Sequence, residues 1–286
     1  MSADVVQLVE CPRDAMQGWK TFIPTEKKID YINSLLRVGF HTIDFGSFVS
    51  PKAIPQMADT KEVLKGLKFE NSTSQLLAIV ANVRGAEDAL AFDEITYLGF
   101  PFSLSPTFQV RNTNSTIVES EKRLEEIAGL CRKHNKKLVV YLSMGFGNPY
   151  GDSYNEDVLI NEAGKMVDRG IEIISLADTV GLATPQQVSF AVDTLTTAYP
   201  ETNFGVHLHS TPQTIREKLE AATEAGCRRF DGALNGIGGC PMAQDDLVGN
   251  MQMEKMIAYF SEKKLLPKLN EAALQKSLEL AAEIFV

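Results

Sequence analysis

The sequence lacks the features that mark several classes of protein. Its four cysteines form no C-x-x-C pair, and no apolar run approaches the roughly 18 residues of a membrane span. The amino terminus has no basic segment followed by an apolar run, as a secretory signal would have. We therefore expect reduced thiols, a cytoplasmic location and no membrane partner.

Basic residues are also scarce. The chain has 28 Lys and Arg against 37 Asp and Glu, and its formal net charge is -9. We expect no nucleic-acid partner, because phosphate backbones are bound by clustered basic side chains. No Pro-rich or Ser-rich linker and no low-complexity segment interrupts the chain, so we predict one domain over residues 1–286.

Short apolar runs recur along the chain, and most are followed by an amphipathic helical pattern. Clear examples of the helical pattern are 26–38 and 115–134. Gly39, Gly170 and Gly226 follow helical patterns, as helix-terminating glycines do. The eight predicted strands are 5–11, 41–48, 75–81, 94–103, 137–146, 172–179, 203–210 and 228–236.

This alternation of strands and helices predicts the fold class. Eight strand-helix repeats fit an α/β protein of the (β/α)8 TIM-barrel type better than two doubly wound domains. We expect the barrel to occupy about residues 1–243 and additional helices to occupy about residues 244–286. In such barrels the active site lies at the carboxyl ends of the strands.

Two of the chain's four histidines, His207 and His209, are separated by one residue in the seventh predicted strand. Side chains at i and i+2 of a strand share a face, so both imidazoles can converge on one point. That point could hold a metal ion, or the pair could be hydrogen-bonded groups inside the barrel. The pattern alone leaves both interpretations open.

Other polar residues fall at predicted strand ends. Asp14 with the two imidazoles makes a mixed N/O set, which suits Mg²⁺, Mn²⁺ or Zn²⁺ with positions open for substrate. Arg13 and Asp14 could equally form a local ion pair. Cys240, in the glycine-rich "GIGGCP" segment, is either a proton-transfer group or an inert thiol.

Several longer motifs carry a family resemblance. They are "ECPRDAMQG" (10–18), "SFVSPKAIPQMADTKEVLKGL" (47–67), "ISLADTVGLATP" (174–185), "HLH" (207–209) and "GIGGCPMA" (236–243). Together they resemble the DRE-TIM metallolyases, and among these the hydroxymethylglutaryl-CoA lyases. The resemblance extends over nearly the whole chain. It departs from the family pattern at Ser210, where an aspartate is usual.

The resemblance implies roles for particular residues. The divalent-metal ligands would be Asp14, His207, His209 and Asn250, with Mg²⁺ or Mn²⁺ favoured over Zn²⁺. The residues that would act in catalysis, each at a position matching the family's motif, are Arg13, Asp44, Asp178, His207 and Cys240. The partner would be a small-molecule acyl-CoA, and a homodimer is possible.

The implied reaction is retro-Claisen cleavage of 3-hydroxy-3-methylglutaryl-CoA to acetyl-CoA and acetoacetate. It needs a base for the C3 hydroxyl, and the sequence leaves His207, Asp44 and Asp178 as candidates. One alternative is a related lyase or Claisen condensing enzyme acting on another branched 3-hydroxy acid or its CoA ester. Another, from a different class, is a non-catalytic metal-binding barrel.

Overall fold

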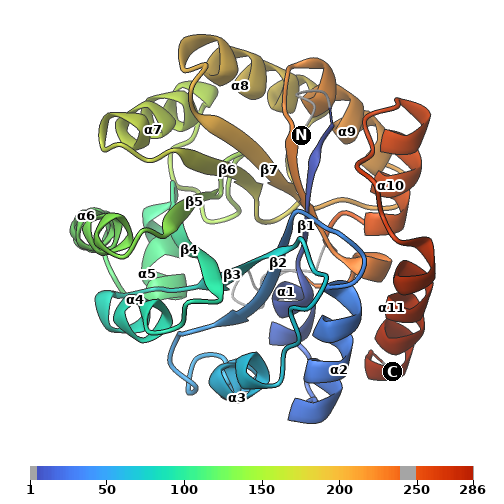
Figure 1. The fold of residues 1–286 in the computed structure, drawn as a ribbon. Helices are drawn as coiled ribbons and strands as arrows, with labels where there is room; N and C mark the ends of the chain where they lie inside the picture. Colours follow the sequence, from blue (N-terminus) through green and yellow to red (C-terminus); the bar gives the residue numbers. More distant parts are fainter. Residues whose placement is uncertain (1–4, 239–248, 286) are drawn as a thin grey trace.

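Eight parallel strands close into a barrel in the order of the sequence (Figure 1). The computed structural model describes residues 5–238 and 249–285. The predicted (β/α)8 fold is confirmed. The strands are β1 (Gln7–Glu10), β2 (Thr42–Ser47), β3 (Gln75–Ile79), β4 (Ile95–Ser103), β5 (Lys137–Ser143), β6 (Ile173–Asp178), β7 (Asn203–Leu208) and β8 (Arg229–Gly232).

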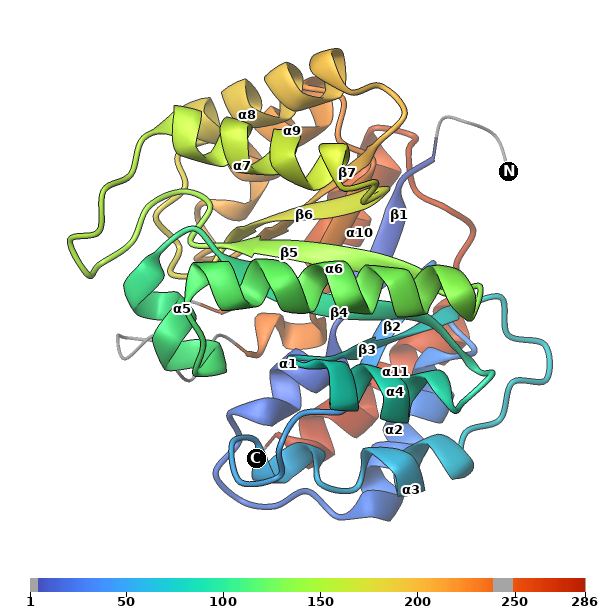
Figure 2. The same ribbon diagram turned by 90° about the vertical axis from the view of Figure 1, so that its left-hand side faces the viewer.

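Helices surround the barrel, as Figures 1 and 2 show. Near the carboxyl terminus, α11 packs beside α2 on the outside of the barrel (Figure 1). The helices are α1 (Pro12–Gln17), α2 (Thr25–Leu35), α3 (Thr60–Lys65), α4 (Val83–Leu90), α5 (Pro106–Thr113), α6 (Ile117–Lys133), α7 (Glu156–Asp168), α8 (Pro185–Ala198), α9 (Ile215–Glu224), α10 (Met253–Glu262) and α11 (Glu271–Ile284), with short 3-10 turns at Pro55–Met57 and Leu234–Gly236.

The first strand is shorter than its apolar run suggests. It ends at Glu10, because Pro12 occupies the first position of α1, where its missing N–H is tolerated. Arg13 and Asp14 therefore lie in the first turn of a short helix and not on the strand itself.

The eighth strand is also shorter than predicted. β8 ends at Gly232, and a 3-10 turn replaces the expected continuation to residue 236. Asn235 has a φ of 61° in this turn, a left-handed conformation that ends strand geometry. Gly39, Gly170 and Gly226 have positive φ values, which confirms the predicted helix ends.

Arg229, at the start of β8, is a fully buried cation in the barrel interior. Its register partner on β7 is Gly205, whose own partner on β6 is Ser175. The missing side chain of Gly205 leaves room for the stem of Arg229. In the described part of the chain the guanidinium nitrogens have no hydrogen-bond partner, and the group lies 5.8 Å from the centre of the Tyr97 ring.

Gly205→Ala is expected to lower the free energy of unfolding. A Cβ at this position would lie 3.0 Å from both Cδ and Cγ of Arg229, and overpacking of this kind costs about 1–3 kcal/mol. Urea unfolding of Gly205→Ala, Arg229→Ala and the double variant measures the effect. We expect a coupling energy above about 0.5 kcal/mol between the two substitutions, because Gly205→Ala should lower the free energy of unfolding less when Arg229 is absent.

Gly129→Ala provides the matched control. Gly129 lies in α6, and a Cβ there would meet no atom within 4 Å. We expect this substitution to raise stability by about 0.5–1 kcal/mol, because glycine is unfavourable inside a helix. An equal penalty for Gly205→Ala with and without Arg229 would contradict the proposed fit of the two residues.

Candidate active site

A cavity of about 390 Å³ lies at the carboxyl ends of the strands, within the size range of small-molecule sites. It is lined by polar groups from α1, from β7 and from the residue that follows β7, by apolar side chains of the barrel, and by α5. The side chains used below are Arg13, Asp14, Arg111, Tyr141, His207 and His209.

Asp14, His207 and His209 converge in this cavity. Their potential ligand atoms all lie within 4.8 Å of one another. Asp14 and His209 are buried, whereas the side chain of His207 keeps 13% of its exposure. Burial, followed by the neighbouring His207, lowers the pKa of His209 to about 4. Its imidazole is therefore neutral at neutral pH, the state in which histidine binds metals.

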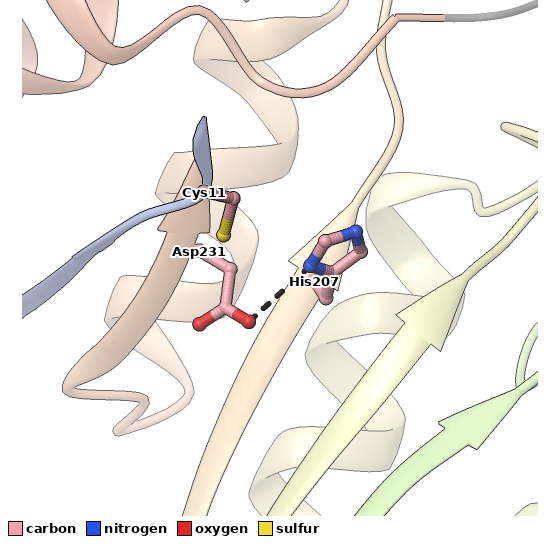
Figure 3. A group of neighbouring side chains, drawn as sticks. All are labelled: Cys11, His207 and Asp231. Carbon is pink, nitrogen blue, oxygen red and sulfur yellow. Dashed lines mark hydrogen bonds and ion pairs between the residues drawn. The ribbon is translucent and has the colours of Figure 1, made fainter. Parts of the chain in front are cut away.

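His207 is anchored by Asp231, a residue of β8 that the sequence analysis missed. The Asp231 Oδ2 lies 3.2 Å from His207 Nδ1, while the other ring nitrogen points away (Figure 3). Burial lowers the pKa of His207, but the hydrogen bond and charge of Asp231 outweigh it and raise that pKa overall. A carboxylate that orients a histidine in this way is a common support for a metal ligand. An acidic residue inside a buried strand was the available signal.

Cys11 lies beside the same pair and forms a second group of potential ligands with His207 and Asp231 (Figure 3). Burial, followed by the charge of Asp231 and other carboxylates, raises the pKa of the Cys11 thiol well above its usual value. A protonated thiol is a poor metal ligand. The donor chemistry therefore favours the group containing Asp14.

Asn250 reaches this site from the segment that follows the eighth strand. Its backbone forms an antiparallel bridge with His209, and its Nδ2 donates hydrogen bonds to Asp14 Oδ2 at 2.7 Å and to the Ile237 carbonyl at 3.0 Å. A metal would be bound by the side-chain oxygen of Asn250, whereas here the nitrogen faces Asp14. The role of Asn250 as a ligand stays a prediction.

Arg13 is fixed by carboxylates on two sides. Its Nε lies 3.0 Å from Asp44 Oδ2, its Nη2 lies 2.5 Å from the same oxygen, and its Nη1 lies 3.1 Å from Asp14 Oδ1. The local ion pair weighed from the sequence is thus present, and Asp44 adds to it. Burial raises the pKa of Asp44 to about 6 despite the neighbouring guanidinium. Bidentate pairing holds the Arg13 side chain in one orientation.

Asp178 and Asp44 lie behind the residues that line the cavity, and Asp44 contacts the site through Arg13. Among the described residues, neither of these carboxylates lines the cavity. Asp178, at the end of β6, accepts a hydrogen bond from the buried Lys218, which the sequence analysis also missed. The predicted catalytic Cys240 lies outside the described residues.

The donor set at Asp14 fits a divalent metal ion. It combines one carboxylate with two imidazoles, one of them kept neutral by burial and the other oriented by Asp231. Such a mixed N/O set has few protein ligands, so positions stay open for substrate oxygens.

Comparisons with known proteins agree with the fold and show the family. The model of the family described as HMGL-like matches residues 6–281. The chain is 33% identical to the hydroxymethylglutaryl-CoA lyase of Bacillus subtilis, over 93% of this chain and 96% of that protein. It is 33% identical to the mitochondrial hydroxymethylglutaryl-CoA lyase of Bos taurus, over 98% of this chain and 84% of that protein.

A solved structure is similarly close. The HMG-CoA lyase of Acinetobacter baumannii, in complex with coenzyme A and 3-methylmalate, matches with a TM-score of 0.91 and 31% sequence identity. The match covers 100% of this chain and 92% of that chain.

Proposed function

Because the chain belongs to the HMGL-like family of carbon-carbon lyases, we propose that it cleaves 3-hydroxy-3-methylglutaryl-CoA to acetyl-CoA and acetoacetate. The observation that carries the proposal is the convergence of Asp14, His207 and His209 beside a fixed Arg13 in one cavity. This is the arrangement that a retro-Claisen cleavage needs: a place for chelating oxygens and a cation for the leaving enolate.

We assign the metal to Asp14 and His209, with His207 and Asn250 completing the protein ligands. A bound Mg²⁺ or Mn²⁺ ion would lower the pKa of the chelated C3 hydroxyl and orient the bond to be broken. The chain's own contribution is to hold these ligands in place. Gln17 does so by donating from its Nε2 to Asp14 Oδ1 at 2.6 Å.

Arg13 stabilises the charge that develops on the thioester oxygen as the C2 fragment leaves. The guanidinium is already oriented by Asp44 and Asp14, so it needs no rearrangement during the reaction. A preorganised cation is worth several kcal/mol at a developing negative charge. Arg13 therefore contributes to the rate of the chemical step.

The candidates for the base are narrowed by their surroundings. Among the described candidates, Asp44 is held by Arg13 and Asp178 by Lys218, whereas His207 lines the cavity. Asp231 occupies the Nδ1 of His207, so Nε2 is its one nitrogen for either role. His207 takes the hydroxyl proton there only where the metal is held by the other three ligands, because one lone pair cannot bind both. Cys240 would return a proton to the departing carbon, as its motif implies.

Features at the cavity mouth support an acyl-CoA substrate. Arg111 lines the cavity from α5, and its guanidinium lies 4.6 Å from the centre of the Tyr150 ring. An arginine held against an aromatic ring is well suited to phosphate oxygens. A cytoplasmic location and a homodimer remain part of the proposal. Within the described residues, no helix is long and apolar enough to span a membrane.

The test is an assay of acetyl-CoA release from a panel of 3-hydroxyacyl-CoA thioesters in the presence of Mg²⁺ or Mn²⁺. We expect turnover of 3-hydroxy-3-methylglutaryl-CoA, and none after chelation until the metal is restored. Turnover of a different thioester, with none of the methylglutaryl compound, would refute the assigned substrate. Activity that survives chelation would refute the assigned metal.

A further inference from the structure

Lys218, on the barrel-facing side of α9, is an unusual buried cation. Its side chain is 4% exposed, although lysine is seldom buried unless it is paired. Burial of an ammonium group is costly unless several acceptors replace its water. Lys218 must therefore be held by specific partners.

Its two partners belong to neighbouring strand ends. The Lys218 Nζ donates to Asp178 Oδ2 at 3.0 Å and to the main-chain carbonyl oxygen of His209 at 2.8 Å. Asp178 ends β6, and its register partner Leu208 ends β7 and immediately precedes His209. A single ammonium group thus joins the ends of the two strands, at the residue that carries one of the proposed metal ligands.

The adjoining side chain offers no comparable support. Ser210 is buried directly after His209, and among the described residues its Oγ has no hydrogen-bond partner. The aspartate usual at this position in the family could act as a hydrogen-bond acceptor close to the metal ligands, a kind of support that ligands commonly need. The His209 ring forms a hydrogen bond with the backbone of Thr179, which orients the imidazole but does not hold the His209 main chain.

Asp178 is tied to the same arrangement. It is buried, and the backbone N–H groups of Leu182 and Ala183 also donate to its carboxylate. Together with the hydrogen bond from Lys218, these contacts hold the carboxylate of Asp178 in place at the end of β6. Asp178 is then the anchor of Lys218.

We propose that Lys218 is a positioning residue of the metal centre, which fixes the main chain of His209 while Asp178 fixes Lys218. This inference rests on the proposed metal site but not on the identity of the substrate. Removal of the Lys218 ammonium group would free the carbonyl of His209 and leave the buried carboxylate of Asp178 without its cation. The backbone of His209 would then be less restricted, and its imidazole would be held less firmly in the position that binds the metal.

The experiment measures Mn²⁺ binding to the full-length, metal-free protein by the loss of the free-ion signal in electron paramagnetic resonance, without substrate. We expect Lys218→Met to weaken Mn²⁺ binding by about 10- to 100-fold, the usual effect of removing a group that supports a ligand. The matched control is Lys255→Met. Lys255 donates to the carbonyl of Pro212, which lies like His209 between β7 and α9 but at an exposed position. Loss of Lys255 should therefore leave Mn²⁺ binding unchanged.

Lys218→Met leaves the buried Asp178 carboxylate without its cation, which by itself should lower stability. A second variant therefore separates the effect on positioning from the effect on stability. In Lys218→Met with Asp178→Leu no buried charge is left, and we expect thermal stability to recover while Mn²⁺ binding stays weak. Lys218→Arg, which keeps the cation, should restore part of the affinity. If either Lys218→Met variant binds Mn²⁺ as tightly as the wild type, Lys218 is only structural and the proposal is overturned.

The outcome is separable from that of the proposed function. Weak Mn²⁺ binding in the Lys218 variants supports the positioning role even if 3-hydroxy-3-methylglutaryl-CoA is not cleaved. Cleavage by the wild type, combined with unchanged Mn²⁺ binding in the variants, supports the function and overturns the positioning role. A wild-type protein that binds no Mn²⁺ overturns the positioning role, whereas the proposed function is still decided by the assay of acetyl-CoA release.

Discussion

Arg13→Gln is expected to lower kcat by at least about 10³-fold, the upper end of the loss seen when one preorganised donor is removed. The reason is that the guanidinium carries a full charge and is held at one orientation by Asp44 and Asp14. A neutral amide is shorter, carries no charge and cannot stabilise an enolate oxygen to the same degree. Steady-state release of acetyl-CoA measures the change.

Mn²⁺ affinity should be unchanged in this variant. Asp14 keeps its hydrogen bonds from Gln17 and Asn250, so the carboxylate remains oriented without Arg13. The loss of rate is therefore expected in kcat, with the metal still bound. Full activity in Arg13→Gln would refute the assigned role.

Arg13→Gln also leaves the buried Asp44 without its cation. The double variant with Asp44→Asn removes that unpaired carboxylate, and we expect it to remain inactive. Recovery of activity in the double variant would show that the loss came from the stranded Asp44 carboxylate and not from the missing guanidinium.

His209→Gln should weaken Mn²⁺ binding by more than about 100-fold, because loss of a direct ligand should exceed the effect of removing a supporting group. The imidazole is buried and kept neutral at neutral pH, since its pKa is lowered to about 4, and it faces Asp14 and His207. Glutamine fills much of the space but cannot place an equivalent nitrogen. Calorimetric titration with Mn²⁺ measures the change.

His41→Gln is the matched control. His41 precedes β2 at the opposite end of the barrel, where its Nδ1 lies 2.9 Å from Thr42 Oγ1. This substitution should leave Mn²⁺ binding as in the wild type. Equal affinities in His209→Gln and the wild type would remove His209 from the ligand set.

Local patterns were enough to predict the barrel and part of the site. The period-2 rule placed His207 and His209 on one face, and the alternation of strands with helices placed that face at the carboxyl end of a barrel. Strand limits were less accurate at β1 and β8. There Pro12 and the left-handed Asn235 ended the strands before their apolar runs did.

The supporting residues were not predictable in the same way. Asp231 meets His207, and Lys218 meets the His209 carbonyl, only because neighbouring strands and an outer helix are brought together when the barrel closes. Nothing in the local sequence distinguishes Lys218 from an exposed helical lysine. Its importance became visible through its burial and its two partners.

The sequence by itself determined the fold class, because strands and helices alternate along most of the chain. It also determined the H-x-H pair and the candidate ligand Asp14, because each of these depends on a pattern within one short segment. Only the tertiary structure decided which carboxylates serve the cavity: Asp14 lines it, Asp44 holds Arg13, Asp231 holds His207, and Asp178 is tied to Lys218. A carboxylate's role depends on which cation or donor it meets, and those partners lie far away along the chain.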